Sequence, residues 1–250
     1  MLRVRGLTVG YGGEPVLDGI DLDLESGHFA SLIGPSGSGK TSILRVVTNL
    51  LQPEHGSIEL DVNKREIGFL FQDDALLPWR TVRQNVTLGL RIRGAASEDA
   101  DTQAEHWLTR LGLEGFGDRY PGQLSGGQRK RVAIAQVLAL RPKLLLMDEP
   151  FASLDAIVRT RITQELLDWV EREHLTVLLV THDLEEAIGV SDEVHVLSHG
   201  PRATIRARHS IDIPRPRNVL QVRRHPDFGP LLQTLWDELA GEPPEKGTAT

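Results

Sequence analysis

The sequence predicts an α/β fold built around a parallel sheet, and three short apolar runs carry that prediction. Each run has the length and composition of a strand that is buried on both faces, and each is followed by a glycine-rich or polar segment. In parallel sheets, ligands bind beyond the carboxyl ends of the strands, so we expect the chemistry in the segments after these runs. The runs occupy residues 28–33, 143–147 and 176–180.

Length and composition exclude several classes of protein. The 250 residues suit one large domain, or one domain with an inserted lobe. Hydrophobic residues make up 40% and charged residues 25%, which is typical of a globular protein in water. There is no cysteine, so a disulfide framework and thiolate chemistry are excluded. No apolar run approaches the roughly eighteen residues that cross a bilayer, and the N-terminus lacks a signal-peptide pattern. We therefore expect a chain that is neither exported nor membrane-spanning by its own sequence.

The charge is negative overall but uneven along the chain. A formal net charge of −7 argues against broad binding to nucleic acid. The stretch from 201 to 225 is nevertheless rich in arginine, and we interpret it as a solvated face. Contact with an anionic lipid or with a partner is the alternative. The arginines of this basic stretch are Arg202, Arg206, Arg208, Arg215, Arg217, Arg223 and Arg224.

The N-terminal region predicts two strands, Leu2–Val9 and Val16–Leu24, in which apolar residues alternate with polar ones. A glycine-rich turn separates them and carries one aromatic residue, Tyr11. Its ring can stack on a purine base. An ordinary turn aromatic is the alternative, and these residues alone favour it.

The first apolar run leads into a phosphate-binding loop pattern, in which Gly and Gly-Lys-Thr are separated by four residues. Glycines let the backbone wrap a phosphate chain, and the amide groups at the start of the following helix, expected over Thr41–Leu50, face the anion. The lysine can reach the β- and γ-phosphates, and the threonine hydroxyl can ligate Mg²⁺. A chance glycine- and serine-rich turn is the alternative. The expected nucleotide contacts are Gly34, Pro35, Ser36, Gly37, Ser38, Gly39, Lys40, Thr41 and Ser42.

Two short strands are expected next, over residues 57–60 and 66–71, and Gln72 directly follows the second. At a strand end, a glutamine amide oxygen can ligate a metal ion or a water beside a phosphate. A solvated surface glutamine is the alternative interpretation.

Residues 73 to 135 predict a helical lobe inserted between strands. Thr81 is a possible N-cap for a helix over Val82–Ile92, and Ser97 can cap a second helix that runs to about Leu111. An apolar cluster, Leu76-Leu77-Pro78-Trp79, precedes the first helix. It can receive a partner, or it can be core of the lobe; both interpretations stay open.

A second glycine loop predicts a second anion site in the same chain. Ser125 is suited to cap a helix expected over Arg129–Leu140, and the two glycines before that helix leave amide groups exposed at its positive end. A simple helix cap is the alternative. The loop consists of Leu124, Ser125, Gly126, Gly127 and Gln128.

Three candidate catalytic side chains follow the other two apolar runs. Asp148 and Glu149 come at the end of the second run, where Asp148 can hold Mg²⁺ through water and Glu149 can polarise an attacking water. His182 follows the third run, at the same expected sheet edge, which favours a contact with the γ-phosphate. Solvated acids and a structural histidine are the alternatives. A strand over Glu193–Leu197 and a disordered segment from Gly241 to Thr250 complete the chain.

Taken in chain order, these segments resemble the motifs of an ATP-binding cassette (ABC) ATPase. Tyr11 is similar to the aromatic residue that stacks on adenine in this family, which reverses the interpretation of Tyr11 given above. The resemblance covers about residues 1 to 225, and Leu-Ser-Gly-Gly-Gln is highly specific to the family. The matching segments are residues 34–41 (Walker A), Gln72 (Q-loop), 124–128 (signature), 144–149 (Walker B), Ser153-Leu154-Asp155 (D-loop) and His182 (switch histidine).

The resemblance implies a fold and a set of roles. The fold is an α/β P-loop NTPase core with a parallel sheet, an antiparallel β-subdomain and an inserted α-helical subdomain. An ATPase domain over 1–225 is followed by a C-terminal helix and a flexible tail over 226–250. ATP and Mg²⁺ are the implied ligands, with Thr41, Gln72 and Asp148 at the metal. Glu149 is the implied general base, and His182 the γ-phosphate sensor.

The resemblance also implies a head-to-tail homodimer, in which each ATP lies between the phosphate loop of one subunit and the signature of the other. Asp155 then contacts the partner subunit. The expected partners are transmembrane permease subunits and, indirectly, a solute-binding protein, with no nucleic acid. The expected location is the cytoplasmic face of the cell membrane.

The chain also resembles, more finely, the branch of importers that handles nitrate, sulfonate, taurine, bicarbonate or pyrimidine thiamine precursors. This resemblance rests on Phe71-Gln72, on residues 76–82 and 85–86, and on residues 213–217. Lys130 and Gln136 depart from the common family pattern, which has Gln and Arg there, and Ala152-Ser153 inverts a common Ser-Ala order. None of these departures removes a catalytic group.

Two alternative interpretations of the function remain. A soluble ABC ATPase that acts on nucleic acid or ribosomes is one, although such proteins often carry two cassettes or basic surfaces. A P-loop kinase is the other, and the signature loop opposes it.

Overall fold

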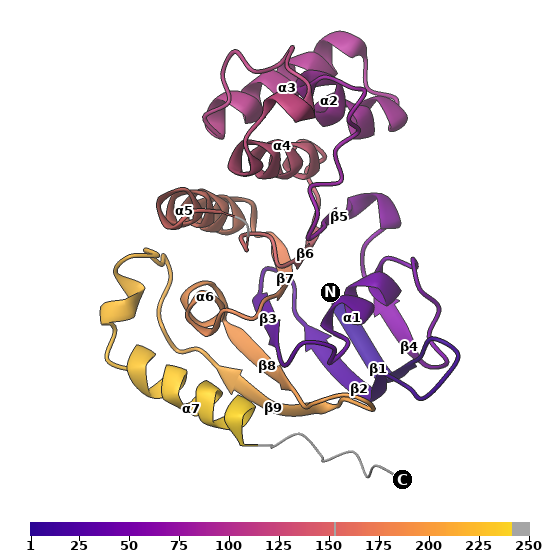
Figure 1. The fold of residues 1–250 in the computed structure, drawn as a ribbon, viewed down its shortest axis with the longest axis vertical. Helices are drawn as coiled ribbons and strands as arrows, with labels where there is room; N and C mark the ends of the chain where they lie inside the picture. The colour runs from indigo at the N-terminus through magenta and orange to yellow at the C-terminus, as the bar shows by residue number, and fades with distance from the viewer. Residues whose placement is uncertain (153, 242–250) are drawn as a thin grey trace. The chain divides into compact units, whose positions relative to one another are not determined.

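The computed structural model describes residues 1–152 and 154–241. This part of the chain divides into two compact units. Of the described residues, unit 1 contains 1–61 and 176–241, and unit 2 contains those between 62 and 175. Unit 2 is therefore an insertion between the two segments of unit 1. Figure 1 labels the elements of both units.

Unit 1 contains an antiparallel sheet at its N-terminal end. The sheet order is β2-β1-β4, formed by β1 (Leu2–Val9), β2 (Leu17–Leu24) and β4 (His55–Leu60). β1 pairs antiparallel with both neighbours. Leu2, Val4 and Leu7 of β1 are fully buried, as expected for a strand that alternates apolar and polar residues. The expected antiparallel β-subdomain is confirmed.

The second sheet of unit 1 carries the phosphate loop. Within this unit, β3 (Phe29–Ile33) lies between β7 (Thr176–Val180) and β8 (Glu193–Leu197), and it is parallel to both. β9 (Ile205–Ser210) adds to β8 in antiparallel direction. All five residues of β3 and of β7 are buried. These are the apolar runs that predicted a parallel sheet, and the α/β class is confirmed.

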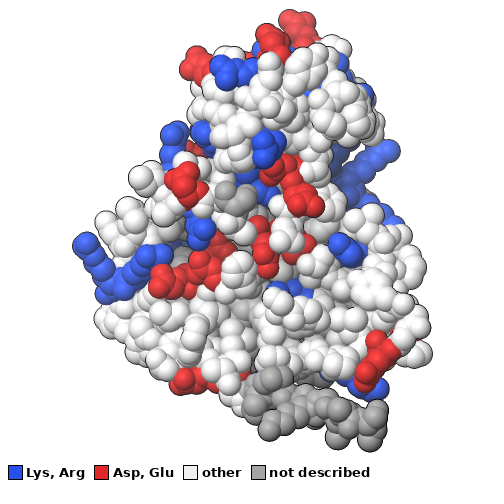
Figure 2. All heavy atoms as spheres, viewed as in Figure 1, with Lys and Arg blue, Asp and Glu red and all other residues white. Residues whose placement is uncertain are grey.

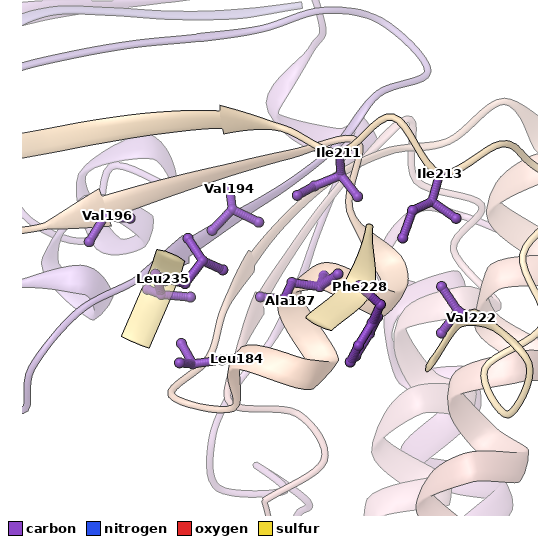
Figure 3. Packing of buried hydrophobic residues seen from close by; sticks show 11 residues of the cluster. Leu184, Ala187, Val194, Val196, Ile211, Ile213, Val222, Phe228 and Leu235 are labelled. Carbon is purple, nitrogen blue, oxygen red and sulfur yellow. The ribbon is translucent and has the colours of Figure 1, made fainter. Parts of the chain in front are cut away.

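Three helices and a short 3-10 turn complete unit 1: α1 (Lys40–Val47), α6 (Leu184–Val190), the turn Val222–Arg224 and α7 (Phe228–Ala240). Figure 3 shows how α7 is held, with Phe228 and Leu235 packed near side chains of α6 and β8. Leu235 is fully buried in this cluster. The C-terminal helix is thus part of the core of unit 1. Residues 242–250, expected to be a disordered tail, lie outside the described residues.

The basic stretch from 201 to 225 is tied to acidic side chains of its own unit. Asp192 forms ion pairs with both Arg215 and Arg217, and Arg217 is almost fully buried. Arg202 pairs with Asp18, Arg208 with Glu193, and Arg223 with Glu185. On the face shown in Figure 2, basic and acidic side chains are likewise interspersed. Six of the seven arginines are exposed, as expected for a solvated face, and Arg217 is the exception because it is buried.

Unit 2 consists of a strand pair and a set of helices. β5 (Ile67–Leu70) and β6 (Leu144–Asp148) run parallel. The helices are α2 (Val82–Ile92), α3 (Ser97–Arg110), α4 (Gly126–Leu138) and α5 (Ala156–Glu173), with 3-10 turns at Lys64–Glu66 and Pro121–Gln123. Helices α2, α3 and α4 pack together, and Trp107 of α3 meets Trp169 of α5 edge to face.

Among the described residues, no helix combines the length and the apolar composition that a membrane span requires.

Several helix boundaries differ from those expected. Helix α4 begins at Gly126 rather than Arg129, because Ser125 and Gln128 form a capping box that places both glycines in the first turn. Ser97 is the first residue of α3 and not its cap, which is Ala96. Helix α1 ends at Val47 rather than Leu50, since Asn49 adopts a φ of 60° that a helix cannot continue.

Candidate functional site

The loop from Gly34 to Thr41 joins β3 to α1 in unit 1. Gly37 and Gly39 have φ angles of 82° and 86°, in the left-handed region that favours glycine. Space also requires Gly39, because a Cβ there would lie 2.7 Å from Cγ of Leu17. The two glycines thus fix a tight turn that leads directly into the N-terminus of α1. The positive end of that helix faces the same loop.

Lys40 lies across this loop rather than out in solvent. Its Nζ donates to the carbonyl oxygens of Gly34 and Pro35, both at 2.8 Å, and the residue is buried. The Ser38 hydroxyl is also buried and has no hydrogen-bond partner among the described residues. A buried hydroxyl without a partner costs free energy unless a ligand satisfies it. A cation and an unsatisfied donor inside one loop fit a phosphate group.

Tyr11 extends from the turn between β1 and β2. Its ring is 59% exposed, while its hydroxyl hydrogen-bonds the Ser42 hydroxyl of α1 at 2.8 Å. The contact anchors the phenol end of the ring beside the helix that follows the phosphate loop. An exposed aromatic face held in this way is suited to stacking on a base.

His182 lies at the same sheet edge as the phosphate loop. β7 and β3 are parallel and pair Val180 with Leu32, so their carboxyl ends meet, and the amide of Thr181 donates to the Leu32 carbonyl at 3.2 Å. The next turn is fixed by Asp183, whose carboxylate accepts from the amide of Glu186 and caps α6. The His182 side chain is exposed at this edge.

A surface pocket of about 670 Å³ also lies beside His182. It is lined by residues 182–185 and by Gly229, Leu232, Gln233 and Trp236 of α7. His182 is therefore open to solvent on the side that faces α7.

In unit 2, Gln72 and Glu149 meet beyond the ends of β5 and β6. The strands pair Leu70 with Met147 in parallel, which brings the residues that follow to one edge. The Gln72 amide donates to the Glu149 carboxylate at 3.5 Å. Asp148, the last residue of β6, is buried. Glu149 has a φ of 44°, which is uncommon for a residue with a Cβ and marks a strained turn.

The second glycine loop forms the N-terminus of α4. The Ser125 hydroxyl accepts from the amide of Gln128 at 3.3 Å, and the Gln128 side chain accepts from the amide of Ser125 at 2.9 Å. This reciprocal cap confirms Ser125 as the N-cap and leaves the Gly126 and Gly127 amides in the open first turn. Leu124 is buried and anchors the loop.

The segment after β6 leads into α5. Asp155 is the N-cap of α5, and its carboxylate accepts from the amide of Val158 at 3.0 Å. Asp155 is exposed, whereas Leu154 is buried. Ser153 of the expected D-loop lies outside the described residues.

Comparison with known proteins decides the family. The family model described as "ABC transporter" matches residues 17–152, which is just over half of the chain. This chain belongs to the ABC transporter family. It is an ABC ATPase, as the order of its motifs led us to expect.

The relatives narrow the group within the ABC family. The chain is 45% identical over 207 residues to the taurine import ATP-binding protein TauB of Escherichia coli (strain K12), which covers 80% of this chain and 81% of TauB. It is 40% identical over 225 residues to the bicarbonate transport ATP-binding protein CmpC of Synechocystis, covering 87% of this chain. The chain spans only 34% of the length of CmpC. These relatives support the expected nitrate, sulfonate and taurine branch.

A solved structure shares the fold. The dimeric ATP-binding cassette MJ0796, in a post-hydrolysis state bound to ADP and Pi, matches with a TM-score of 0.78 and 32% identity. The match covers 86% of this chain and all of that chain. The α/β P-loop class of the ABC cassette is thereby confirmed.

The ABC motifs fall into two groups, one in each unit. Tyr11, the phosphate loop and His182 belong to unit 1, whereas Gln72, Asp148, Glu149, the signature and Asp155 belong to unit 2. In unit 1 the phosphate loop and His182 follow the carboxyl ends of β3 and β7, and in unit 2 Gln72 and Glu149 follow β5 and β6, whereas the signature and Asp155 lie at helix N-termini. The metal set of Thr41, Gln72 and Asp148 draws on both units and stays a prediction.

The sequence missed one buried group in unit 2. Lys130 of α4 is almost fully buried, yet from the sequence it was only a departure from the family pattern. A signal was present, because Val132, Ala133 and Ile134 place the lysine at the start of the apolar part of α4. Its acceptors, which lie near Gln72, could not be read from the sequence.

Proposed function

We propose that this protein is the ATP-hydrolysing subunit of an importer for a small anionic or related solute, of the nitrate, sulfonate or taurine kind. The similarity to TauB and CmpC supports the import role and this class of solute. Solute selection is the task of other subunits.

ATP binding is assigned to unit 1. Lys40 supplies the positive charge, the amide groups of the loop and the Ser38 hydroxyl supply further donors to the phosphates, and Tyr11 supplies a stacking face for adenine. The single observation that carries this assignment is the ammonium group of Lys40 held inside the loop beside an unsatisfied buried hydroxyl. An anionic ligand accepts from both groups at once.

Hydrolysis is assigned to Glu149 as general base. The Gln72 amide donates to its carboxylate, a contact that orients the carboxylate. Oxygen donors from Thr41, Gln72 and Asp148 suit Mg²⁺, which supplies charge neutralisation on the phosphates when bound. His182 is proposed to contact the γ-phosphate.

We further propose that two copies act together as a homodimer. The signature residues Ser125–Gln128 form a second donor-rich helix end that their own unit leaves open, and in the dimer they bind the ATP held by the partner's phosphate loop. Asp155, exposed at the start of α5, is the proposed contact across the dimer interface. MJ0796, a similar cassette, is dimeric.

The cluster at residues 76–79 is proposed to receive the permease. Trp79 is 70% exposed, while the backbone of Leu77 is fixed by Asn85, which accepts from the Leu77 amide at 2.8 Å. An exposed tryptophan on a rigid support is typical of a docking site and is opposed to a core role. This docking places the protein at the cytoplasmic face of the membrane through its partner.

Substituting Trp79 tests the docking role. In Trp79→Ala we expect an unchanged melting temperature and ATPase of the isolated subunit, with weaker co-purification with the permease and lost uptake. Ile92→Ala is the matched control, because Ile92 is 76% exposed on the same lobe. A Trp79→Ala protein that binds the permease and supports uptake as wild type would refute the docking assignment.

The solute class is tested with the complete transporter. Vesicles that contain the permease, the solute-binding protein and this subunit should hydrolyse ATP faster when taurine, nitrate, bicarbonate or an alkyl sulfonate is supplied. Stimulation by a cationic or sugar solute instead would overturn the class.

A soluble ABC ATPase acting on nucleic acid is the second candidate. No observation favours it, because Arg202, Arg208, Arg215, Arg217 and Arg223 of the basic stretch pair with acids of their own unit.

A further inference from the structure

Lys130 is a buried cation whose hydrogen-bonding capacity is fully used. Its side chain is 1% exposed. The ammonium donates to the Gln72 carbonyl at 2.7 Å and to the Phe71 carbonyl at 3.3 Å, and it lies 3.3 Å from the Asp74 carboxylate. Three N–H groups thus meet three acceptors. All three acceptors belong to one short segment, residues 71–74, which follows β5.

A buried ion pair is a poor way to stabilise a fold, since desolvation offsets much of the attraction. An apolar side chain at position 130 would serve the core of unit 2 as well. What an apolar residue cannot do is hold the backbone carbonyls of two successive residues in place. The contacts of Lys130 therefore indicate that it fixes the position of the backbone at residues 71 and 72.

The helix that carries Lys130 also carries the signature loop. Ser125 caps α4, and Lys130 lies five positions further along the same rigid element. The neighbouring Arg129 adds a second link to the segment, because its Nε lies 3.4 Å from the Asp74 carboxylate. Helix α4 and the segment after β5 are thus joined by two cations on one carboxylate.

The contacts of Lys130 continue through Gln72 to Glu149, the proposed general base. Lys130 holds the backbone of Gln72, and the side chain of Gln72 donates to Glu149 at 3.5 Å. The path from the signature helix to Glu149 therefore consists of two hydrogen bonds within unit 2. The amide that donates to Glu149 is therefore tied to α4 through the backbone of Gln72.

We propose that Lys130 is a positioning residue, which sets Gln72 against Glu149 and couples the signature helix to hydrolysis. This inference rests on the proposed function, in which Glu149 is the general base. The contacts of Lys130 described above all lie in unit 2, whereas the phosphate loop belongs to unit 1. Its loss should therefore change the turnover step and leave ATP binding intact.

The test compares Lys130→Met with Lys143→Met in the full-length protein. Met has nearly the length of Lys but no donor, and Lys143 is an exposed lysine of the same unit, paired with Glu66. We expect kcat of Lys130→Met to fall roughly 10- to 100-fold, as when a reacting group is misplaced by about 1 Å, with KM for ATP changed by less than about twofold. Lys143→Met should behave as wild type. Lys130→Gln, which keeps two amide donors, should retain part of kcat and replaces the Met variant if that variant does not fold.

A double-mutant cycle with Gln72→Ala isolates the mechanism. If Lys130 acts through Gln72, then Lys130→Met should lower kcat no further in the Gln72→Ala background. Independent, multiplying losses, or a lower melting temperature with normal kcat, would overturn the inference and leave a structural lysine. Glu149→Gln separates a failure of the proposed function from a failure of the Lys130 inference. Normal turnover in Glu149→Gln contradicts the proposed function itself. Slow turnover in Glu149→Gln together with normal turnover in Lys130→Met contradicts only the inference about Lys130.

Discussion

At the scale of single residues, the negative charge of the Glu149 carboxylate can be removed without removing the contacts that hold this side chain. Glu149 holds a strained backbone conformation at the end of β6 and receives the Gln72 amide. Neither feature depends on the negative charge of the carboxylate. A neutral isostere therefore removes the base and keeps the surroundings.

Glu149→Gln should bind ATP and hydrolyse it about 10²- to 10⁴-fold more slowly, because a general base contributes roughly that factor. ATP titration and steady-state turnover measure the two effects. Glu173→Gln, at an exposed position at the end of α5 and outside any ABC motif, is the control for the same exchange. Turnover of Glu149→Gln near the wild-type rate would remove Glu149 from its proposed role.

A second residue-scale effect concerns stability. His195 of β8 is almost fully buried, and burial lowers its pKa to about 4, while Asp23 opposes that shift without overcoming it. The Glu193 carboxylate lies 3.7 Å from its Nε2, but Glu193 is paired with Arg208. Between pH 6.5 and 4 the unfolded chain binds a proton at this histidine and the folded chain does not. The free energy of unfolding therefore falls as the pH is lowered through this window.

His195→Val should flatten that dependence, removing up to about 3 kcal/mol of the loss between pH 6.5 and 4. Urea unfolding at a series of pH values measures it. His55→Val, at an exposed position in β4, controls for the exchange of His for Val in a strand. Parallel pH curves for wild type and His195→Val would show that His195 is protonated equally in both states.

At the scale of elements, we expect Lys40 and the backbone of the phosphate loop to bind the phosphates together. Lys40→Ala should lose most of its ATP affinity, because the charge that meets the phosphates is removed and its two carbonyl contacts are broken. Isothermal titration with a non-hydrolysed ATP analogue measures the dissociation constant. Lys64→Ala, outside any ABC motif, is the control. An unchanged dissociation constant in Lys40→Ala would mean that the loop binds no nucleotide.

The same scale shows what the sequence could predict. β3, β6 and β7 were predictable because each is a continuous apolar run, buried on both faces. β9 was not predicted, since it is an edge strand in which exposed Arg206 and Arg208 alternate with half-buried residues. The start of α4 was placed too late because glycines indicate a loop, and only the capping box shows that the helix has begun.

The candidate site was predictable in its residue types and less so in its contacts. Motif spacing identified Gln72 and Glu149 separately, but their hydrogen bond depends on the pairing of β5 with β6. The linkage through Lys130 joins residues far apart in the chain, and no local pattern encodes it. The ion pairs of the C-terminal segment were missed for the same reason.

At the scale of the whole molecule, the two anion-binding loops predict shared sites. Lys40→Ala and Ser125→Arg should each be inactive as homodimers, the first without phosphate binding and the second with a bulky cation in the signature. A mixed dimer would combine one doubly damaged site with one intact site. We therefore expect part of the ATPase activity to return when the two variants are mixed.

The measurement is ATPase activity of the mixture, with subunit exchange verified by affinity tags of two kinds. Mixing each variant with itself under two tags provides the control. Mixed dimers that form and remain inactive would indicate that each site is built within one chain.

The insertion of unit 2 into unit 1 also has a consequence for synthesis on the ribosome. β3 is paired on both sides by strands that come much later in the chain, since β3 ends at Ile33 and β8 at Leu197. At roughly 5–20 residues per second, the partners of β3 emerge about 7–33 s after it. Throughout that interval a nascent chain carries an apolar strand with two unpaired edges, the kind of segment that aggregates or is held by chaperones. Production of this protein should therefore respond to slower translation and to chaperone supply more than its length alone suggests.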